Sequence, residues 1–194
     1  IEGLLSETLN NGGKVIIPAF SVGRTQLLVY TLHQLVDAGR LPDFPIFVDS
    51  PLSVNATEVF RLHPECFNRD IYTFLREKEN PFGMDNLTYI RKASESIKLN
   101  TLEGPAIIIS SSGMCEAGRI RHHLKNNISD PNDLILFVGY CAYNTLGAVI
   151  RAGIDPVYIF GEPHEVKARV ASFDGFSGHA DRKELGRYVE SLTG

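Results

Sequence analysis

The sequence predicts an α/β fold of three layers, in which a mostly parallel sheet carries helices on both faces. Short apolar segments rich in β-branched residues alternate with segments whose apolar residues recur at helical spacing. The apolar segments are nearly continuous runs, which is typical of strands buried on both faces. Strands that alternate with helices along a chain favour parallel pairing through crossover helices.

Six segments, each bounded by Gly, Pro or Asp, are predicted to be strands. They are residues 14–20, 45–51, 105–113, 134–140, 156–162 and 166–176. The first five are nearly continuous apolar runs, so we expect them inside the parallel sheet. The sixth contains VKARVASF, in which apolar and polar residues alternate, so we expect an edge strand with one face in water.

Helices are predicted between these strands. The clearest is residues 21–39, where apolar side chains form a helical stripe that Gly39 closes. The other predicted helices are residues 53–63, 117–127, 145–153 and 181–192. Residues 64–104 interrupt the alternation, and their sequence predicts extra helices with turns around Pro81 and Gly83.

The composition bounds the class of protein. The chain has 194 residues, 43% hydrophobic and 22% charged, which fits one globular domain with a buried core. A net charge of -4 leaves only a local basic patch for any nucleic-acid contact. Three cysteines without a CxxC motif favour a reducing compartment, and we expect the cytoplasm. The apolar runs are too short to span a bilayer, and a start at IEGLLSETL without Met predicts a piece of a longer protein.

Five loops follow predicted strands, and ligands of open α/β sheets bind in such loops. The loops are PAFSVGRTQ, DSPLS, SSSGMCEAGR, GYCAYNTLG and GFSGHAD. They share small residues and hydroxyls. Glycine lets a backbone approach a ligand closely, and the N–H groups at the start of a helix favour an anion.

The most polar loop runs from Ser110 to Gly113. It can cradle a phosphate, with positive charge from Arg119, Arg121 and Lys125. The alternative, which composition alone favours, is a serine that caps a helix with a solvated basic face.

For several other polar residues, the sequence supports two alternative roles. Arg24 can reach a phosphate or tie down an edge of the sheet, and the two are evenly matched. Asp49 can be catalytic or a helix cap, with the cap favoured. Adjacent helical residues point about 100° apart, so His122 and His123 cannot chelate one metal, and surface or capping roles are favoured.

His179 follows Gly175 and Gly178 in the sequence, and Asp181 comes two residues after it. An unperturbed histidine pKa near ~6.5 suits a proton donor for a leaving oxygen. A structural role is equally supported at this point. The motifs HxHxDH, HExxH, GxxxxGK[ST] and GxSxG are absent, so this chain supplies no ligand cluster of a metal nuclease.

Five stretches in this order resemble the β-CASP ribonucleases of the metallo-β-lactamase superfamily, in particular the bacterial and archaeal RNA-specific branch. They are VIIPAFSVGRTQLLVYTL, VDSPLS, IIISSSGMCEAGRIRHHL, FVGYCAYNTLG and GFSGHADRKEL. The resemblance implies a β-CASP domain over residues 1–194, without the metallo-β-lactamase halves that would flank it. Asn144 departs from the family, where Gly is usual, and Asn is the residue that next best tolerates a glycine-like backbone.

The resemblance also implies a site. The intact enzyme would hold two zinc ions through ligands outside this chain, and we expect none bound by this chain alone. His179 would be the general acid for the leaving 3′-oxygen. The implied contacts to the substrate phosphate or RNA are Ser177, Gly178, Ser111, Ser112, Gly113, Arg24 and Arg119.

The expected function is therefore an RNA-binding cap domain of a zinc-dependent ribonuclease, inactive when isolated. Its expected partners are RNA and the metallo-β-lactamase domain of the same protein, with no membrane, and a homodimer stays open. The alternative is a non-catalytic RNA- or protein-binding scaffold of the same family. Endonucleolytic and 5′-exonucleolytic cleavage both fit these residues.

Overall fold

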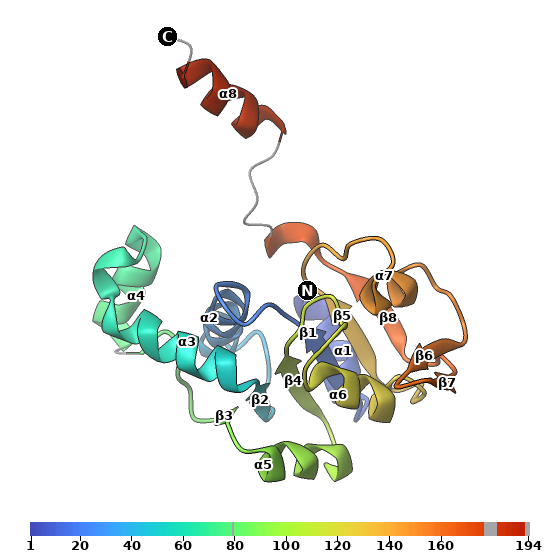
Figure 1. Ribbon diagram of the computed structural model, residues 1–194. Coiled ribbons are helices and arrows are strands. Elements are labelled where there is room, and N and C mark those ends of the chain that lie inside the picture. The colour runs from blue at the N-terminus through green and yellow to red at the C-terminus, as the bar shows by residue number, and fades with distance from the viewer. Residues whose placement is uncertain (79, 177–181, 193–194) are drawn as a thin grey trace.

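The protein is built on a six-stranded parallel sheet (Figure 1). The computed structural model describes residues 1–78, 80–176 and 182–192. The strands are β1 (Lys14–Pro18), β2 (Ile46–Asp49), β3 (Leu87–Ile90), β4 (Ala106–Ser110), β5 (Leu134–Phe137) and β8 (Arg169–Ser172). Their order across the sheet is β3-β2-β4-β1-β5-β8. The predicted α/β fold with a parallel sheet is confirmed.

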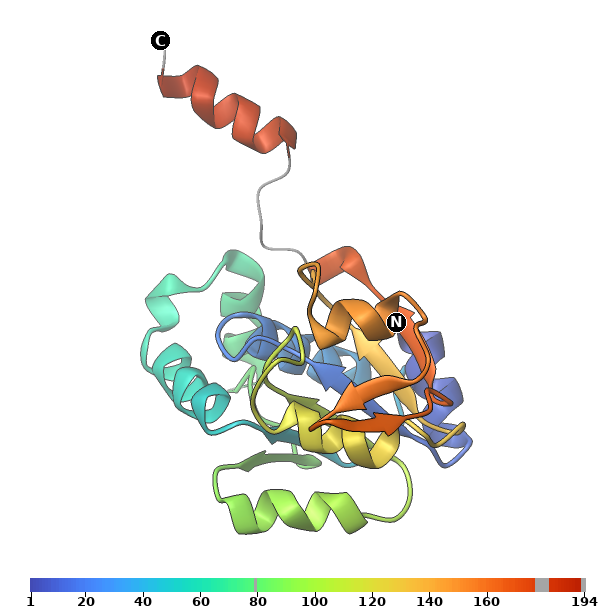
Figure 2. The same ribbon diagram turned by 45° about the vertical axis from the view of Figure 1, so that its right-hand side comes forward.

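The described part of the chain contains eight helices, and helices cover both faces of the sheet (Figure 2). They are α1 (Glu2–Asn10), α2 (Arg24–Asp37), α3 (Pro51–Leu62), α4 (Arg69–Lys78), α5 (Ala93–Lys98), α6 (Ile120–Asn127), α7 (Leu146–Arg151) and α8 (Arg182–Leu192). Short 3-10 turns lie at Pro64–Cys66, Leu99–Thr101 and Asp174–Phe176. The helix expected over residues 181–192 corresponds to α8, whose described side chains are exposed along its length.

Two apolar clusters form the core, one on each face of the sheet. Val15 and Ile17 point to the face that α1 and α2 cover, where they share a cluster with Leu28. Ile16, between them, points to the opposite face and shares a cluster with Leu124 of α6. Successive strand residues face opposite sides, so both faces need apolar residues. This explains why the central strands are continuous apolar runs.

One predicted strand does not enter the main sheet. Residues 156–162 contain β6 (Val157–Ile159), which pairs in antiparallel fashion with β7 (Glu162–His164). Phe160 and Gly161 between them have φ angles of 53° and 83°, the left-handed backbone of a two-residue hairpin turn. Tyr158 is exposed, so the segment alternates and only one of its faces is buried. The expectation of a buried parallel strand here is wrong.

One edge strand of the sheet was predicted correctly from the sequence, and the other was not predicted. β8, in the alternating segment 166–176, is an edge strand paired with β5, as predicted. The opposite edge is β3, which lies within residues 64–104, where only helices and turns were expected. β3 is four residues long, and only Ile90 in it is buried, so it carries little apolar signal. None of the described helices is long and apolar enough to cross a membrane.

Candidate functional site

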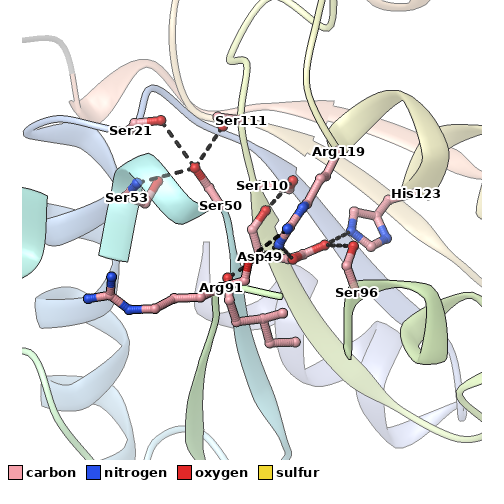
Figure 3. A network of polar contacts seen from close by, with 11 residues as sticks. Ser21, Asp49, Ser50, Ser53, Arg91, Ser96, Ser110, Ser111, Arg119 and His123 are labelled. Atoms are coloured by element: carbon pink, nitrogen blue, oxygen red, sulfur yellow. Dashed lines mark hydrogen bonds and ion pairs between the residues drawn. The ribbon is translucent and has the colours of Figure 1, made fainter. Parts of the chain in front are cut away.

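A group of serine hydroxyls joins three loops at the carboxyl edge of the sheet, after β1, β2 and β4 (Figure 3). Ser111 Oγ donates a hydrogen bond to Ser50 Oγ at 2.9 Å, and the hydroxyls of Ser21 and Ser50 lie 3.3 Å apart. Ser50 Oγ also accepts the backbone N–H of Ser53 at 3.2 Å, which caps α3. The expectation that Asp49 caps this helix is wrong, because its neighbour Ser50 does so.

Asp49 lies at the end of β2, fully buried, at the centre of a polar network (Figure 3). Its carboxylate accepts hydrogen bonds from Arg119 Nη1 at 2.7 Å, Ser96 Oγ at 2.6 Å and His123 Nε2 at 2.7 Å. Burial alone would raise the pKa of Asp49, but the hydrogen bonds from His123, Ser96 and Arg119 together lower it below the ordinary value. The charged carboxylate therefore ties β2 to α5 and α6.

The two adjacent histidines differ in environment. His123 is 1% exposed, so the predicted surface or capping role is wrong for it. A carboxylate oxygen only accepts, so Nε2 of His123 carries the hydrogen shared with Asp49. His122 is exposed, and its ring centroid lies 4.7 Å from that of Phe160. Adjacent residues of a helix point about 100° apart, which places one histidine in the core and the other on the surface.

The guanidinium of Arg119 is engaged within the fold. Besides its bond to Asp49, Nη2 donates to the carbonyl oxygen of Arg91 at 2.7 Å and Nη1 to that of Ile90 at 3.3 Å. The side chain is 19% exposed. Arg119 thus joins the carboxyl ends of β2 and β3. Its predicted contact with a substrate phosphate stays a prediction.

The other basic residues of α6 point to the β6–β7 hairpin. The guanidinium carbon of Arg121 lies 4.2 Å from the ring centroid of Phe160, and Lys125 forms an ion pair with Glu162. The first residue of α6 is Ile120, and no side-chain cap bond precedes it. The alternative of a serine capping this helix is therefore wrong. The loop of residues 110–118, called the serine loop below, is held by other contacts.

The loop from Ser110 to Gly118 is closed by its own hydrogen bonds. The N–H of Ser112 donates to the carbonyl of Ala117 at 3.0 Å, and the N–H of Ala117 donates to Ser112 Oγ at 3.3 Å. Gly118 has a φ of 82°, and a Cβ there would lie 2.3 Å from the carbonyl oxygen of Ser111. Only glycine fits at this position. The loop is thus held in one shape that presents Ser111 and Ser112.

Two pockets adjoin at this edge, because Phe20 and Val22 line both of them. One, of about 440 Å³, is lined by Ser111 and Ser112. The other, of about 590 Å³, is lined by Arg24. The structure thus brings Ser111, Ser112 and Arg24 to neighbouring pockets.

Arg24 begins α2 and has an unusual environment. Its Nε and Nη1 atoms are buried, and no hydrogen-bond partner lies within the described part of the chain. Burial lowers the pKa of this guanidinium, although an arginine side chain stays charged at neutral pH. The alternative that Arg24 ties down an edge of the sheet has no hydrogen bond to support it within residues 1–78, 80–176 and 182–192. A charged group is left facing a pocket.

The remaining predicted site residues are placed as follows. Gly113 packs against Phe20, whose ring would lie 3.1 Å from a Cβ at this glycine. Ser177, Gly178 and His179 lie outside the described residues, so their roles stay predictions. Asn144 has a φ of 67°, so it adopts the glycine-like backbone that its position needs.

Three features of the site were missed by sequence reasoning. Ser96 was not singled out, and the partners of Asp49 were not recognised. The spacing of Arg119 and His123 held a signal, because residues four apart share one face of a helix. The pocket beside Arg24 could not be predicted as one site, since Phe20, Tyr140 and Phe176 come from three separate loops and the sequence does not show that these side chains meet.

The chain matches a known family over more than half of its length, and it belongs to the Beta-Casp domain family. The family model, "Beta-Casp domain", matches residues 25–150. A second model, "Zn-dependent metallo-hydrolase RNA specificity domain", matches residues 163–193. The resemblance found in the five sequence stretches is confirmed.

Curated relatives give the same result. The chain is 38% identical to Ribonuclease TTHA0252 of Thermus thermophilus, over 94% of this chain and 42% of that protein. It is 35% identical to an RNase J-like protein of Methanocaldococcus jannaschii, over 97% of this chain and 42% of that protein. It is 35% identical to transcription termination factor FttA of Pyrococcus abyssi, over 97% of this chain and 30% of that protein. The chain therefore spans less than half the length of these relatives.

Proposed function

We propose that this chain is the RNA-binding β-CASP part of a zinc-dependent ribonuclease, and that the complete protein hydrolyses RNA phosphodiester bonds. The observation that carries the proposal is the carboxyl edge of a Beta-Casp sheet. There, serine hydroxyls line one pocket, and Arg24, whose Nε and Nη1 have no hydrogen-bond partner among the described residues, lines the adjoining one. Hydroxyls and a free guanidinium bind phosphate oxygens. The name Ribonuclease TTHA0252 of one relative supports the same activity.

The proposed roles depend on whether a residue lies at the pockets or is bound within the fold. Ser111, Ser112 and Arg24 line the pockets and contact RNA phosphates. Gly113, which is buried against Phe20, adds a backbone contact. Arg119 supports the serine loop from behind, because it binds Asp49, whose carbonyl oxygen accepts a hydrogen bond from Ser110 in the loop. We also assign to Arg119 the phosphate contact predicted for it. Ser177 and Gly178 complete the phosphate contacts, and His179 protonates the leaving oxygen.

Zinc belongs to the proposal for the complete protein. The described residues include no group of three or more His, Cys, Asp or Glu that could hold a metal ion, so this part of the chain does not fit a zinc site. We therefore place the two zinc ions in the metallo-β-lactamase domain and assign no step to them here. The three cysteines are free, which supports the cytoplasm as the proposed location.

The test compares His179→Ala with the unchanged complete protein at equal measured zinc content. General-acid help is worth about 10²–10⁴ in rate, so cleavage of a single-stranded RNA should fall by that factor while zinc content stays the same. The alkaline limb of the pH–rate profile should also disappear, because the variant no longer has a proton to lose. His63→Ala is the matched control, since His63 is exposed and pairs only with Glu65 among described residues.

Two results would contradict the proposal in different ways. A His179→Ala variant with full activity would remove the general-acid role. An unchanged protein that binds RNA but never cleaves it, with or without added zinc, would favour the scaffold alternative instead.

A further inference from the structure

The pocket beside Arg24 combines aromatic rings with one cation. It measures about 590 Å³, within the range of roughly 300–1,000 Å³ that is usual for small-ligand sites. Phe20, Tyr140 and Phe176 line it, together with Leu27 and Met114. Phe20 is 47% exposed and Tyr140 is 66% exposed. Two large aromatic side chains of the pocket are thus open to a ligand.

The cation is held at the wall of this pocket. A Cβ built at Gly139 would lie 4.0 Å from Nε of Arg24, so the side chain of Arg24 passes over the end of β5. Its Nε and Nη1 are buried without a hydrogen-bond partner in the described ranges. A buried donor without a partner costs free energy, and an anion that enters the pocket would remove that cost.

These features define the ligand by its chemistry. The rings favour a flat, apolar group that can stack, and the guanidinium favours an anion with oxygen acceptors. Arg24 is the one charged side chain among the pocket residues within the described part of the chain, which favours an anion over a cation as the ligand. A nucleotide carries a stacking base and a phosphate, and single strands bind proteins through this pair of contacts.

We propose that this pocket binds one nucleotide of a single-stranded RNA, with its base against Tyr140 and Phe20 and its phosphate on Arg24. The proposal rests on the proposed function, since it assigns a subsite for the RNA. The adjoining serine pocket shares Phe20 and Val22, so the neighbouring nucleotide lies over Ser111 and Ser112. Single-stranded RNA is selected over duplex, because a paired base cannot enter a pocket between aromatic rings.

The experiment measures binding of the complete protein to a phosphorothioate-stabilised, labelled single-stranded RNA over a range of salt concentrations. Tyr140→Ala should weaken binding about tenfold, which is within the range expected for one stacked base. Arg24→Gln should reduce the magnitude of the slope of log K against log salt by about 0.7, as expected for one lost phosphate contact on a single strand. A folding defect alone would not change this slope.

A second series locates the base. In a set of strands, one abasic ribose is moved along the RNA. The unchanged protein should lose about tenfold in affinity when the abasic ribose reaches the pocket. Tyr140→Ala should show no further loss at that position, because the two changes remove the same contact.

Matched controls separate the pocket from general effects. Tyr158, 65% exposed, lies on β6 and lines none of the pocket. Arg40 lies beyond the other end of α2, about 20 Å away by the helical rise, and pairs with Glu2. Tyr158→Ala and Arg40→Gln should bind RNA as the unchanged protein does.

The outcomes distinguish the two proposals. If the unchanged protein binds no RNA, the proposed function fails and this inference fails with it. If it binds RNA but Arg24→Gln and Tyr140→Ala bind equally well with unchanged salt slopes, the nucleotide pocket is wrong and the proposed function stands. If Tyr140→Ala lowers the unfolding temperature and weakens all strands equally, another part of the protein fills the pocket, which also overturns the inference.

Discussion

Nε2 of His123 lies 2.7 Å from a carboxylate oxygen of Asp49, and both side chains are shielded from solvent. The pair joins the end of β2 to α6, directly behind the serine loop. Ser110 Oγ donates to the carbonyl of Asp49 at 2.8 Å, so one residue holds both the helix and the start of the loop. The buried network is therefore the base on which the exposed hydroxyls rest.

Removing the charge of Asp49 should destabilise the chain. Asp49→Asn leaves the guanidinium of Arg119 without its anion in a mostly buried place, and breaking such a pair costs about 3–5 kcal/mol. Urea unfolding followed by circular dichroism measures the loss. Glu58→Gln is the control, because its ion pair with Arg91 is exposed and should contribute about 0–1 kcal/mol. Equal losses in the two variants would contradict the role given to the Asp49 network.

The same carboxylate predicts an acid dependence of stability. The folded pKa of Asp49 is lowered, so its contribution is fully present above the unfolded pKa of about 3.9 and is lost as pH falls toward the folded pKa. The free energy of unfolding should fall below about pH 4 more steeply in the unchanged chain than in Asp49→Asn. Parallel curves for the two proteins would show that Asp49 is not the group responsible.

Asp133 should behave in the opposite way. It is buried, its Oδ1 accepts the N–H of Lys14 at 2.7 Å, and its Oδ2 has no partner among the described residues. Burial raises its pKa, with a further effect of Asp130, so the charged form is disfavoured in the folded state. The unchanged chain should lose stability as pH rises from about 4 toward the folded pKa.

The measurement for Asp133 is the difference in unfolding free energy between Asp133→Asn and the unchanged chain as a function of pH. The difference should move in favour of the variant as pH rises through that window, whatever the new amide contributes by itself. A difference that is constant with pH would contradict the raised pKa.

Gly118→Ala should disturb the serine loop. The φ of 82° strains any side chain, and the new Cβ would lie 2.3 Å from the carbonyl oxygen of Ser111. Gly12→Ala is the matched control, because Gly12 has a φ of 83° but nothing within 4 Å of its Cβ. Backbone strain alone should cost about 1–2 kcal/mol in both, and Gly118→Ala should cost more and also weaken RNA binding by the complete protein. RNA binding reduced equally by both changes would show that loop shape is not the cause.

Most of the fold was predictable because it depends on local periodicity. Val15, Ile16 and Ile17 form an unbroken apolar run, and such a run is typical of a strand covered on both faces. The exceptions are short elements. Tyr158 and Phe160 belong to a hairpin that the apolar letters around them did not reveal, and β3 is a short edge strand with little apolar signal.

The candidate site was predictable only in part. Glycines and serines in the loops indicated where ligands bind, and the predicted Ser111, Ser112 and Arg24 do lie at neighbouring pockets. The partner of Arg119 could not be predicted, since Asp49 lies 70 positions away along the chain. A side chain that can reach a phosphate can equally reach a carboxylate, and the sequence does not contain the distances that decide between them.

The sequence by itself determined the layers of this protein and the edge at which its loops gather, because strand and helix periodicity act over a few residues. Its five ordered motifs also determined the family. Only the tertiary structure decided which polar groups are paired and which are left open. Burial in the folded chain joins Asp49 to Arg119 and His123, and the same folding leaves Arg24 facing a pocket lined with aromatic rings. The physical reason is that pairing depends on contacts between distant segments, which form only when the sheet brings its loops together.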